Sequence, residues 1–290
     1  MRGATNARLL SGETLLAGVV GRPVRHSLSP RIHSAWIAAA GIDGAYAPFP
    51  IPETGFRRFV DGMRGGVVRG VNVTIPYKEE ALALADAADA LARRSGAANL
   101  LLFHADGEVE ARNTDGPGLI QALAEAPGFD PAAAPAVVLG AGGAARAAVA
   151  ALTAAGAPEV RLVNRTVERA AVVAQSFAEA RAFAWGEMAE AFRGAGAVVN
   201  ATSAGLNGEN ALTGLPLAAL PTSAVVMDMV YKPLETGLLR QARASGRPTV
   251  DGLSMLINQA APAFEAFYGA PVPPGVDVRT LCLEVLEPGG

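Results

Sequence analysis

The sequence predicts an α/β protein of two domains, the second with a doubly wound parallel sheet. Three observations support this prediction. Short apolar runs alternate with segments of helical periodicity along most of the chain, as in a parallel sheet covered by helices. Hydrophobic residues make up 51% of the chain but aromatic residues only 6%, so Ala, Val and Leu must build most of the core. The length of 290 residues fits two domains.

The first domain is expected to contain three strand-helix pairs and a hairpin. Apolar runs that end in turn residues predict strands at 15–20, 45–51 and 70–74. Helical periodicity, with Pro30 and Pro76 at starting positions, predicts the helices that follow them at 31–40, 56–64 and 76–94. An Asp-Gly turn between the β-prone runs 98–103 and 109–113 predicts a hairpin.

The second domain is expected to follow a helix at 116–125 and a Pro/Ala-rich link at 126–135. Strands and helices then alternate, which predicts a parallel doubly wound sheet. We expect a strand-turn-helix unit at 136–155, strands at 160–163, 197–200 and 224–228, a helix from 167 and a helix at 234–245. A last helix at 255–268 comes after the sheet is complete and could pack on either domain.

Charge and residue types argue against several kinds of partner. The 24 basic and 27 acidic residues give a net charge of −3 without a basic block, so nucleic acid is not expected. Cys282 is the sole cysteine and the three histidines lack ligand spacing, so we expect no disulfide and no metal site. No segment resembles a signal sequence or a membrane span. We therefore expect a metal-free protein of the cytoplasm that does not bind membranes.

A glycine-rich turn marks the start of the second domain. Gly140, Gly142 and Ala145 form a Gly-x-Gly-x-x-Ala pattern between a predicted strand and a predicted helix. Such glycines let the backbone approach a pyrophosphate, which the helix N-terminus then stabilises. A plain strand-helix turn is the alternative, because Gly and Ala are abundant in this chain. The context favours a Rossmann-type dinucleotide site.

The end of the next strand indicates which dinucleotide binds. Folds that bind NAD usually place a carboxylate on the ribose 2′-hydroxyl about 20 residues after the turn. Here Asn164, Arg165 and Thr166 occupy that place, and Arg169 follows. Guanidinium and hydroxyl groups bind a 2′-phosphate that a carboxylate would repel. The sequence therefore predicts NADP, although Thr166 alone could simply cap a helix.

Three polar stretches follow predicted strands in the first domain: HSLSP with Ser27 and Ser29, NVTIPYK with Lys78, and NTDG with Asp115. Each has an ordinary explanation as a helix start or helix cap. Lys78 lies in a first helical turn, where the helix dipole disfavours a cation, and this suits the lysine to proton transfer. Because all three stretches lie at strand ends, they could form a ligand site together.

Together these stretches resemble the shikimate dehydrogenase family, whose members reduce 3-dehydroshikimate to shikimate with NADPH. The matching segments occur in the family's order: HSLSP at 26, NVTIPYK at 72, NTDGPG at 113, GAGGA at 140, NRT at 164, NATSAG at 200, MVYKP at 229 and DGLSMLINQA at 251. They cover nearly the whole chain.

The resemblance implies roles for individual residues. Lys78 would be the catalytic acid/base, paired with Asp115. Ser27 and Ser29 would bind the substrate carboxylate. The remaining substrate contacts would be Thr74, Asn99, Asp115, Tyr231 and Gln259. The NADP site would be lined by Gly140, Ala141, Gly142, Gly143, Ala144, Asn164, Arg165, Thr166, Arg169, Met229 and Gly252.

The resemblance also implies the domain organisation. Residues 1–115 and 252–290 would form the substrate domain, because the family returns its C-terminal helices to it, and residues 116–251 would form the Rossmann domain. The small-molecule substrate would be shikimate or 3-dehydroshikimate. The sequence does not give the oligomeric state, and a monomer or a homodimer fits it equally.

Two departures from the family pattern concern the packing of the site. Leu100 stands where the family usually has Thr, and Leu206 where it usually has Met. Relatives that use quinate or NAD typically carry an acid near the NRT position, and none stands there. The alternatives are a broader quinate/shikimate dehydrogenase, a folate-type methylene dehydrogenase, which leaves the paired serines and NTDG unexplained, and a non-catalytic NADP sensor. Retention of both Lys78 and Asp115 argues against the sensor.

Overall fold

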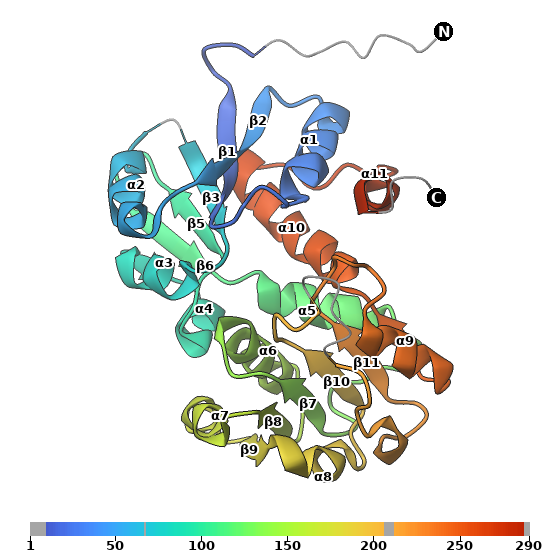
Figure 1. Cartoon of the computed structure of the whole chain (residues 1–290). Helices are drawn as coiled ribbons and strands as arrows, with labels where there is room; N and C mark the ends of the chain where they lie inside the picture. The colour runs from blue at the N-terminus through green and yellow to red at the C-terminus, as the bar shows by residue number, and fades with distance from the viewer. Residues whose placement is uncertain (1–9, 67, 206–211, 287–290) are drawn as a thin grey trace, which may run out of the picture. The chain divides into compact units, whose positions relative to one another are not determined.

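The computed structural model describes residues 10–66, 68–205 and 212–286. The chain divides into two compact units, and each has its own six-stranded sheet (Figure 1). Unit 1 consists of Met1–Ala88, Ala98–Arg112 and Ala260–Cys282. Unit 2 consists of Asp89–Ala97, Asn113–Gln259 and Leu283–Gly290. The predicted α/β class is confirmed.

Unit 1 contains a mixed sheet in the order β2-β1-β3-β5-β6-β4. Its strands are β1 (Leu15–Gly21), β2 (Gly44–Pro50), β3 (Val68–Val73), β4 (Ala87–Ala88), β5 (Leu100–Phe103) and β6 (Val109–Arg112). The first three strands pair in parallel, whereas β5 runs antiparallel to both β3 and β6. The predicted hairpin is therefore confirmed, and it extends a parallel sheet on one side.

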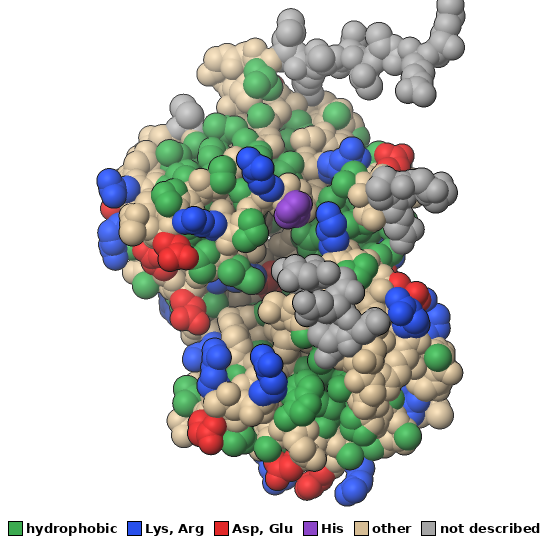
Figure 2. Space-filling view, in the orientation of Figure 1, with side chains coloured by type: hydrophobic (Ala, Val, Ile, Leu, Met, Phe, Trp, Pro, Cys, Tyr) green, Lys and Arg blue, Asp and Glu red, His purple; other side chains and the backbone are tan. Residues whose placement is uncertain are grey.

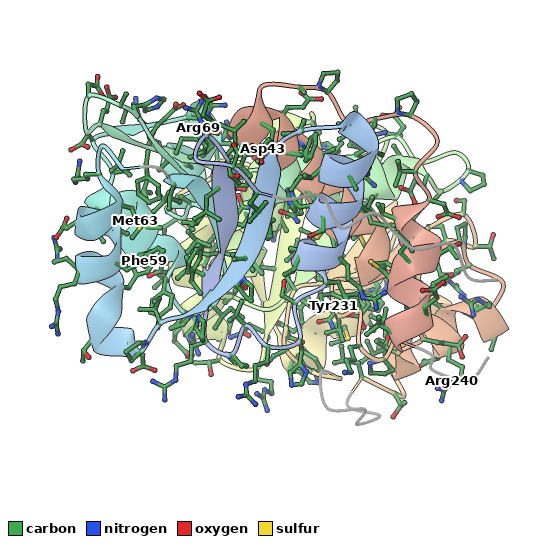
Figure 3. All side chains as sticks on the ribbon, turned by 90° about the horizontal axis from the view of Figure 1, so that it is seen from above. Asp43, Phe59, Met63, Arg69, Tyr231 and Arg240 are labelled. Carbon is green, nitrogen blue, oxygen red and sulfur yellow. The ribbon has the colours of Figure 1, made fainter. Side chains whose placement is uncertain are left out.

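Helices cover both faces of this sheet. They are α1 (Ser29–Ala40), α2 (Phe56–Met63), α3 (Lys78–Leu84), the end of α10 (Gly252–Tyr268) and the start of α11 (Val278–Leu286). Trp36 of α1 packs edge-on against Phe264 of α10 with ring centroids 5.5 Å apart. On the other face Phe59 of α2 packs against Phe49 of β2. In Figure 3, Phe59 and Met63 lie on the side of α2 that faces the strands.

The prediction of one long helix at 76–94 was wrong, because this segment forms α3, β4 and α4 (Ala90–Ser95) instead. Asp86 lies at the break, where its carboxylate pairs with the Arg64 guanidinium at 2.5 Å and accepts the Val109 N–H at 2.8 Å. Asp89 then caps α4 by accepting the Ala92 N–H. The local sequence has a helical pattern, but these polar contacts with distant residues override it.

Unit 2 contains a wholly parallel sheet in the order β12-β11-β10-β7-β8-β9. Its strands are β7 (Ala136–Leu139), β8 (Val160–Asn164), β9 (Ala180–Ala184), β10 (Ala197–Asn200), β11 (Val225–Asp228) and β12 (Thr249–Val250). Read from the β9 edge, this is the 3-2-1-4-5-6 order of a Rossmann fold, with its switch point between β7 and β10. The doubly wound prediction is confirmed.

Two apolar clusters cover the two faces of the second sheet. The helices of this unit are α4, α5 (Asp115–Ala124), α6 (Gly143–Ala154), α7 (Val167–Ala174), α8 (Met188–Phe192), α9 (Gly237–Ala244) and the start of α10. Val138 packs with α5 and α6, while its neighbours Val137 and Leu139 pack with α8 and α9. This alternation is the period of two that a strand buried on both faces requires.

Besides β4 and the short 3-10 helices, four elements were not predicted: β9, α8, β12 and α11. The strands Ala180–Ala184 and Thr249–Val250 lie at the two edges of the second sheet. Thr249–Val250 has only two residues, and Ala180–Ala184 carries a weak hydrophobic pattern with one buried residue, so a periodicity argument passes over both. In addition, α10 begins at Gly252, three residues before the predicted start at 255.

The core of unit 1 contains a histidine. His33 of α1 is fully buried, and its ring lies parallel to the Tyr46 ring with centroids 4.1 Å apart. Among the described residues neither ring nitrogen has a hydrogen-bond partner. Burial lowers the pKa of His33 from 6.5 to about 3, so the imidazole is neutral in the folded protein at ordinary pH.

We expect His33 to make stability fall as the solution becomes acidic. The unfolded chain binds a proton at His33 near pH 6.5, but the folded chain does not until about pH 3. The unfolded state therefore binds more protons across that interval, and stability falls as pH falls. Between pH 7 and pH 5.5 the parent protein should lose about 1 kcal/mol more than His33→Phe.

Urea unfolding at both pH values measures this difference. The fluorescence of Trp36 reports on unit 1, because its ring centroid lies 5.7 Å from that of His33. A Trp185→Phe background removes the signal of the second tryptophan. If the parent protein and His33→Phe lost the same free energy of unfolding between the two pH values, His33 would not be the cause of the acid destabilisation.

Candidate active site

The carboxyl-terminal edge of the unit 1 sheet carries the predicted substrate residues of this unit. Ser27 and Ser29 follow β1, while Thr74 and Lys78 follow β3. Asn99 directly precedes β5, and because β5 is antiparallel to β3 it starts at the same edge. Residues from three distant segments therefore meet at one edge of one sheet.

Backbone hydrogen bonds join Asn99 to the strand and the helix beside it. The Asn99 carbonyl accepts the Val73 N–H at 2.8 Å and the Asn72 Nδ2 group at 3.4 Å. The Ala98 N–H donates to the Lys78 carbonyl at 2.8 Å. Asn99 is buried and Lys78 is half-buried as the first residue of α3. These two side chains thus start from backbone positions fixed beside each other.

The two serines lie at the start of α1. Ser29 is the first residue of the helix and is buried, Ser27 is half-buried, and the Ser29 N–H donates to Ser27 Oγ at 3.3 Å. Neither acts as the helix cap, because Leu28 occupies the cap position and its side chain makes no capping bond. The ordinary explanation of Ser29 as a capping side chain is therefore wrong.

Tyr46 is part of this edge, although no sequence pattern pointed to it. Its hydroxyl donates to Asn72 Oδ1 at 2.7 Å and is also hydrogen-bonded to the Ser29 side chain. Burial raises the pKa of Tyr46 well above 10, so the phenol keeps its proton. An aromatic residue in β2 is typical of an ordinary core, and only the fold brings its hydroxyl to Ser29.

Asp115 and Gln259 belong to unit 2. Asp115 is the first residue of α5 and is largely buried. The neighbouring Thr114 hydroxyl donates to Gln259 Oε1 of α10 at 3.4 Å. The cap of α5 comes from Asn113, whose Oδ1 accepts the Gly116 N–H, and not from the Thr114 side chain. These contacts place Asp115 one residue from a direct link to Gln259.

The glycine-rich turn connects β7 to α6 at the switch point of the second sheet. Gly140 has a φ of +114°, a conformation that residues with a Cβ rarely adopt, and its N–H donates to the Val163 carbonyl at 2.9 Å. Gly142 precedes the first turn of α6 and is exposed, and Gly143, Ala141 and Ala144 are half-buried. The open backbone at a helix N-terminus fits a pyrophosphate.

The predicted 2′-phosphate residues follow β8, the strand beside β7. Arg165, Thr166 and Arg169 are exposed, and Asn164 is half-buried. Asn164 Nδ2 donates to the Thr166 carbonyl at 2.8 Å, which folds the turn back on itself. Thr166 precedes α7 but makes no side-chain cap. Arg165, Thr166 and Arg169, which the sequence predicts for a 2′-phosphate, are thus exposed at the strand end where a ribose carboxylate would otherwise stand.

Met229 and Tyr231 follow β11 and are both half-buried (Tyr231 is labelled in Figure 3). Gly252, at the start of α10, contacts this segment closely. A Cβ at Gly252 would lie 2.5 Å from the Met229 carbonyl oxygen, so no larger residue fits. Of the two departures from the family pattern, Leu100 is fully buried in β5, and Leu206 lies outside the described residues.

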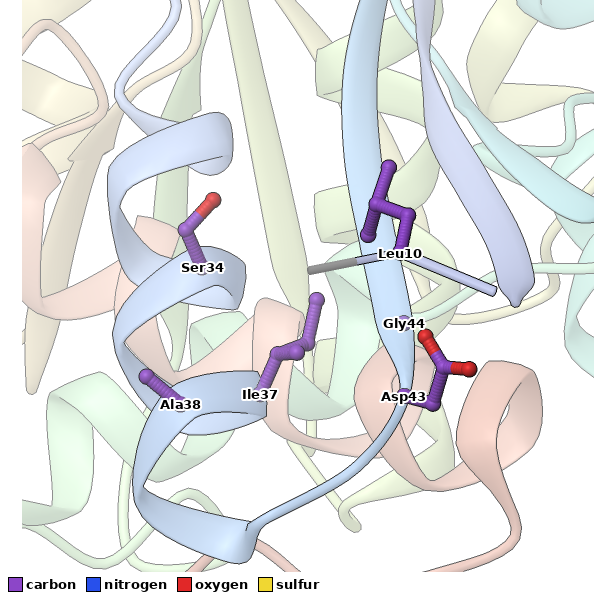
Figure 4. Close-up of a pocket in the computed structure, with 6 residues that line it drawn as sticks. All are labelled: Leu10, Ser34, Ile37, Ala38, Asp43 and Gly44. Carbon is purple, nitrogen blue, oxygen red and sulfur yellow. The ribbon is translucent and has the colours of Figure 1, made fainter. Parts of the chain in front are cut away.

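A pocket of about 150 Å³ lies elsewhere in unit 1 (Figure 4). Its lining includes Ser34 and Ala38 of α1 and Gly44 at the start of β2. It therefore lies at the amino-terminal end of that parallel strand, opposite the edge with Ser27 and Thr74. Ligands of α/β sheets bind at the carboxyl ends, so this pocket is not the candidate site.

The described part of the chain offers neither a metal site nor a membrane span. Within the described ranges, no group of three or more His, Cys, Asp or Glu side chains could hold a metal ion. None of the described helices has the length and apolar character needed to cross a membrane. Cys282 is buried. On the face drawn in Figure 2, the basic and acidic side chains are interspersed.

Comparison with known proteins gives matches over most of the chain. Residues 19–101 match the shikimate dehydrogenase substrate binding domain, and residues 123–208 match the family described as shikimate / quinate 5-dehydrogenase. A shikimate dehydrogenase (NADP(+)) of Caulobacter vibrioides is 58% identical over 97% of this chain and 99% of its own length. One of Paramagnetospirillum magneticum is 48% identical over 90% and 95%.

A solved structure with the same fold carries both ligands. It is shikimate 5-dehydrogenase from Thermus thermophilus in complex with NADP(H) and shikimate. The TM-score is 0.83 at 38% identity, and the match covers 94% of this chain and 100% of that one.

The glycine-rich turn allows a direct test of cofactor binding. Gly142 has an extended backbone, and a Cβ built there meets no atom within 4 Å, so the fold should accept Gly142→Ala with a Tm change below about 2 °C. A bound pyrophosphate would meet the new methyl group, so NADP binding should weaken about tenfold or more. Gly186→Ala, where the space is also open, is the matched control and should bind NADP normally. Calorimetric titration measures both, and unchanged binding in Gly142→Ala would contradict the site.

Proposed function

The chain belongs to the shikimate dehydrogenase family, and from this we propose that it catalyses the reversible, NADPH-dependent reduction of 3-dehydroshikimate to shikimate. The observation that carries the proposal is the 58% identity to an NADP(+) enzyme over 97% of the chain. A match of this length spans both the predicted substrate residues and the predicted NADP residues. We assign residues 1–115 and 252–290 to substrate binding and residues 116–251 to NADP binding.

NADP fits the residues of unit 2. The positive φ of Gly140, the open backbone at Gly142 and the N-terminus of α6 suit a pyrophosphate. Exposed Arg165, Thr166 and Arg169 suit a 2′-phosphate. The cofactor supplies the hydride when it is bound. The chain's own task is then to orient the substrate carbonyl and to manage the proton.

Lys78 is the group that we propose for proton transfer. Only two of the 24 basic residues are lysines, Lys78 and Lys232, and all the others are arginines. An arginine keeps its proton in proteins, whereas an ammonium group can donate one. Protonated Lys78 would stabilise the developing alkoxide and then protonate it. Asp115 is the residue that we propose as the second member of the acid/base pair.

The remaining residues would bind the substrate. Ser27 and Ser29 would donate hydroxyl hydrogen bonds to the carboxylate near the N-terminus of α1. Asn99 has its backbone tied to β3 and α3, which supports a fixed position beside Lys78. The other proposed contacts with the ring hydroxyls and the reacting end are Thr74, Asp115, Tyr231 and Gln259.

Four assays test the proposed reaction. The rate of nicotinamide reduction is measured with shikimate or quinate, each with NADP or NAD. A strong rate only for shikimate with NADP is expected. Comparable rates with quinate or with NAD would instead identify a broader quinate/shikimate dehydrogenase, and no rate in any assay would indicate an NADP-binding sensor.

Replacement of Lys78 separates proton transfer from charge. Lys78→Ala should lower kcat about a hundredfold or more with a modest change in KM. Lys78→Arg should lower kcat by a similar factor, because it retains the charge but cannot release a proton. Lys232→Arg is the matched control at the other lysine, which is exposed, and its kcat should stay unchanged. Retained turnover in Lys78→Ala would exclude the acid/base role.

Replacement of Arg165 tests the choice of cofactor. Arg165→Ala removes a cation proposed to bind the 2′-phosphate, which NAD lacks. The KM for NADP should rise about tenfold or more while the KM for NAD stays nearly constant. Arg240→Ala, another exposed arginine of unit 2, which pairs with Glu235, serves as the control. Equal effects on the two cofactors would refute the assignment.

A further inference from the structure

The strand order of unit 2 divides its sheet into two nucleotide-binding halves. On one side of the switch point lie β7, β8 and β9, with the glycine-rich turn and Arg165; this half takes the adenosine 2′-phosphate. On the other side lie β10, β11 and β12, which leaves this half for the nicotinamide end. This assignment rests on the proposed function, because it assumes that NADP binds here.

Asp228 is the last residue of β11, in the nicotinamide half, and is fully buried. Its Oδ1 accepts Asn200 Nδ2 at 2.8 Å and the Val230 N–H at 3.0 Å. Its Oδ2 accepts the Thr236 hydroxyl at 2.7 Å. Burial raises the pKa of Asp228, and these three donors oppose the rise. The carboxylate thus joins β10, the segment after β11 and the start of α9.

Asn200, the last residue of β10, continues the network to the glycine-rich turn. Its Oδ1 accepts the N–H of Thr202 at 3.0 Å and the hydroxyl of Thr202 at 2.7 Å. A Cβ on Gly140 would lie 3.0 Å from the Thr202 methyl group, so Thr202 packs directly on the turn. The backbone carbonyl of Asn200 also accepts the Met229 N–H at 3.1 Å.

Two chain segments therefore depend on the same buried carboxylate. One is 200–204, which packs on Gly140, and the other is 229–231, which carries Met229 and Tyr231. Beyond Asn200, neither segment is part of a helix or strand. Backbone hydrogen bonds from the Ala201 and Met229 N–H groups hold the start of each segment, and the side-chain network adds to them. The network supplies acceptors for the donors at the start of both segments.

We propose that Asp228 is a positioning residue for the nicotinamide end of the cofactor site, acting through Asn200 on segment 200–204 and directly on segment 229–231. Without the carboxylate, the Asn200 amide and the Val230 N–H lose a shared acceptor, and the two segments lose their common anchor. The 2′-phosphate residues follow β8 in the other half of the sheet and are expected to keep their positions.

Cofactor fragments test this proposal. Titration calorimetry compares NADP⁺ with 2′,5′-ADP, which has the adenosine 2′-phosphate but no nicotinamide. In Asp228→Ala, NADP⁺ binding should weaken about tenfold while 2′,5′-ADP binding stays within about twofold of the parent protein. Asp228→Asn should restore NADP⁺ binding to within about threefold, because its Oδ1 can still accept both donors. Equal loss of both ligands in a folded Asp228→Ala protein would overturn the proposal, as would equal NADP⁺ loss in the Ala and Asn variants.

Thr236→Val provides the matched control. It removes one hydrogen bond to the same carboxylate at the start of α9, away from both segments. Its Tm should fall, but the ratio of NADP⁺ to 2′,5′-ADP affinity should not change. If Asp228→Ala fails to fold, Asn200→Ala tests the same link, since Asp228 keeps Val230 and Thr236 as donors. An unchanged affinity ratio in Asn200→Ala would then overturn the proposal.

The same titrations distinguish failure of this inference from failure of the proposed function. A parent protein that binds neither NADP⁺ nor 2′,5′-ADP would contradict the proposed function, and the inference would fall with it. A parent protein that binds both, together with an Asp228→Ala variant that also binds both normally, would overturn only the inference.

Discussion

Parallel pairing of strands is the constraint on which both the proposed substrate site of unit 1 and the proposed NADP site of unit 2 depend. In each sheet, strands that run in the same direction bring their carboxyl ends to one edge, and the chain leaves each of these parallel strands there. Ser29 and Thr74 are far apart in the sequence but follow neighbouring parallel strands. The same holds for Gly140 and Arg165 in unit 2. Strand direction thus collects the functional residues before any side chain makes a contact.

Strand direction brings these residues to one edge but does not fix the conformation of the loops that carry them. In both units, hydrogen bonds from buried polar side chains fix those loops. In unit 1 the Tyr46 hydroxyl gives its single proton to Asn72, so its oxygen is left to accept from Ser29. In unit 2 the Asp228 carboxylate accepts from the end of β10, the segment after β11 and the residue before α9. Because a buried polar group without a partner is unfavourable, each contact also restricts the backbone that bears it.

Charge is used sparingly and in different chemical forms. Arginines, which keep their charge, stand in the turn after β8, where we propose that the 2′-phosphate binds. A lysine stands at the start of α3, where we propose that a proton is transferred. The proposed carboxylate site uses neutral hydroxyl groups, which bind an anion by hydrogen bonds and leave the net charge of that edge unchanged. The chemistry of each position thus follows from the residue type together with its place in the fold.

The sequence by itself determined the fold class, the doubly wound second sheet and the strand-turn-helix unit at Gly140, and it predicted the residues of the 2′-phosphate site. These features are local. Each depends on the alternation of apolar residues, on turn residues or on the residue type at a strand end, and all of these can be read within about twenty residues. Only the tertiary structure decided that the helix expected at 76–94 breaks at Asp86, whose partners are Arg64 and Val109. Likewise, only the tertiary structure showed that Tyr46 is hydrogen-bonded to Asn72, 26 residues away, and Asp228 to Asn200, 28 residues away. The physical reason is that a hydrogen bond between side chains depends on strand register and loop course, and no local pattern in the sequence specifies either.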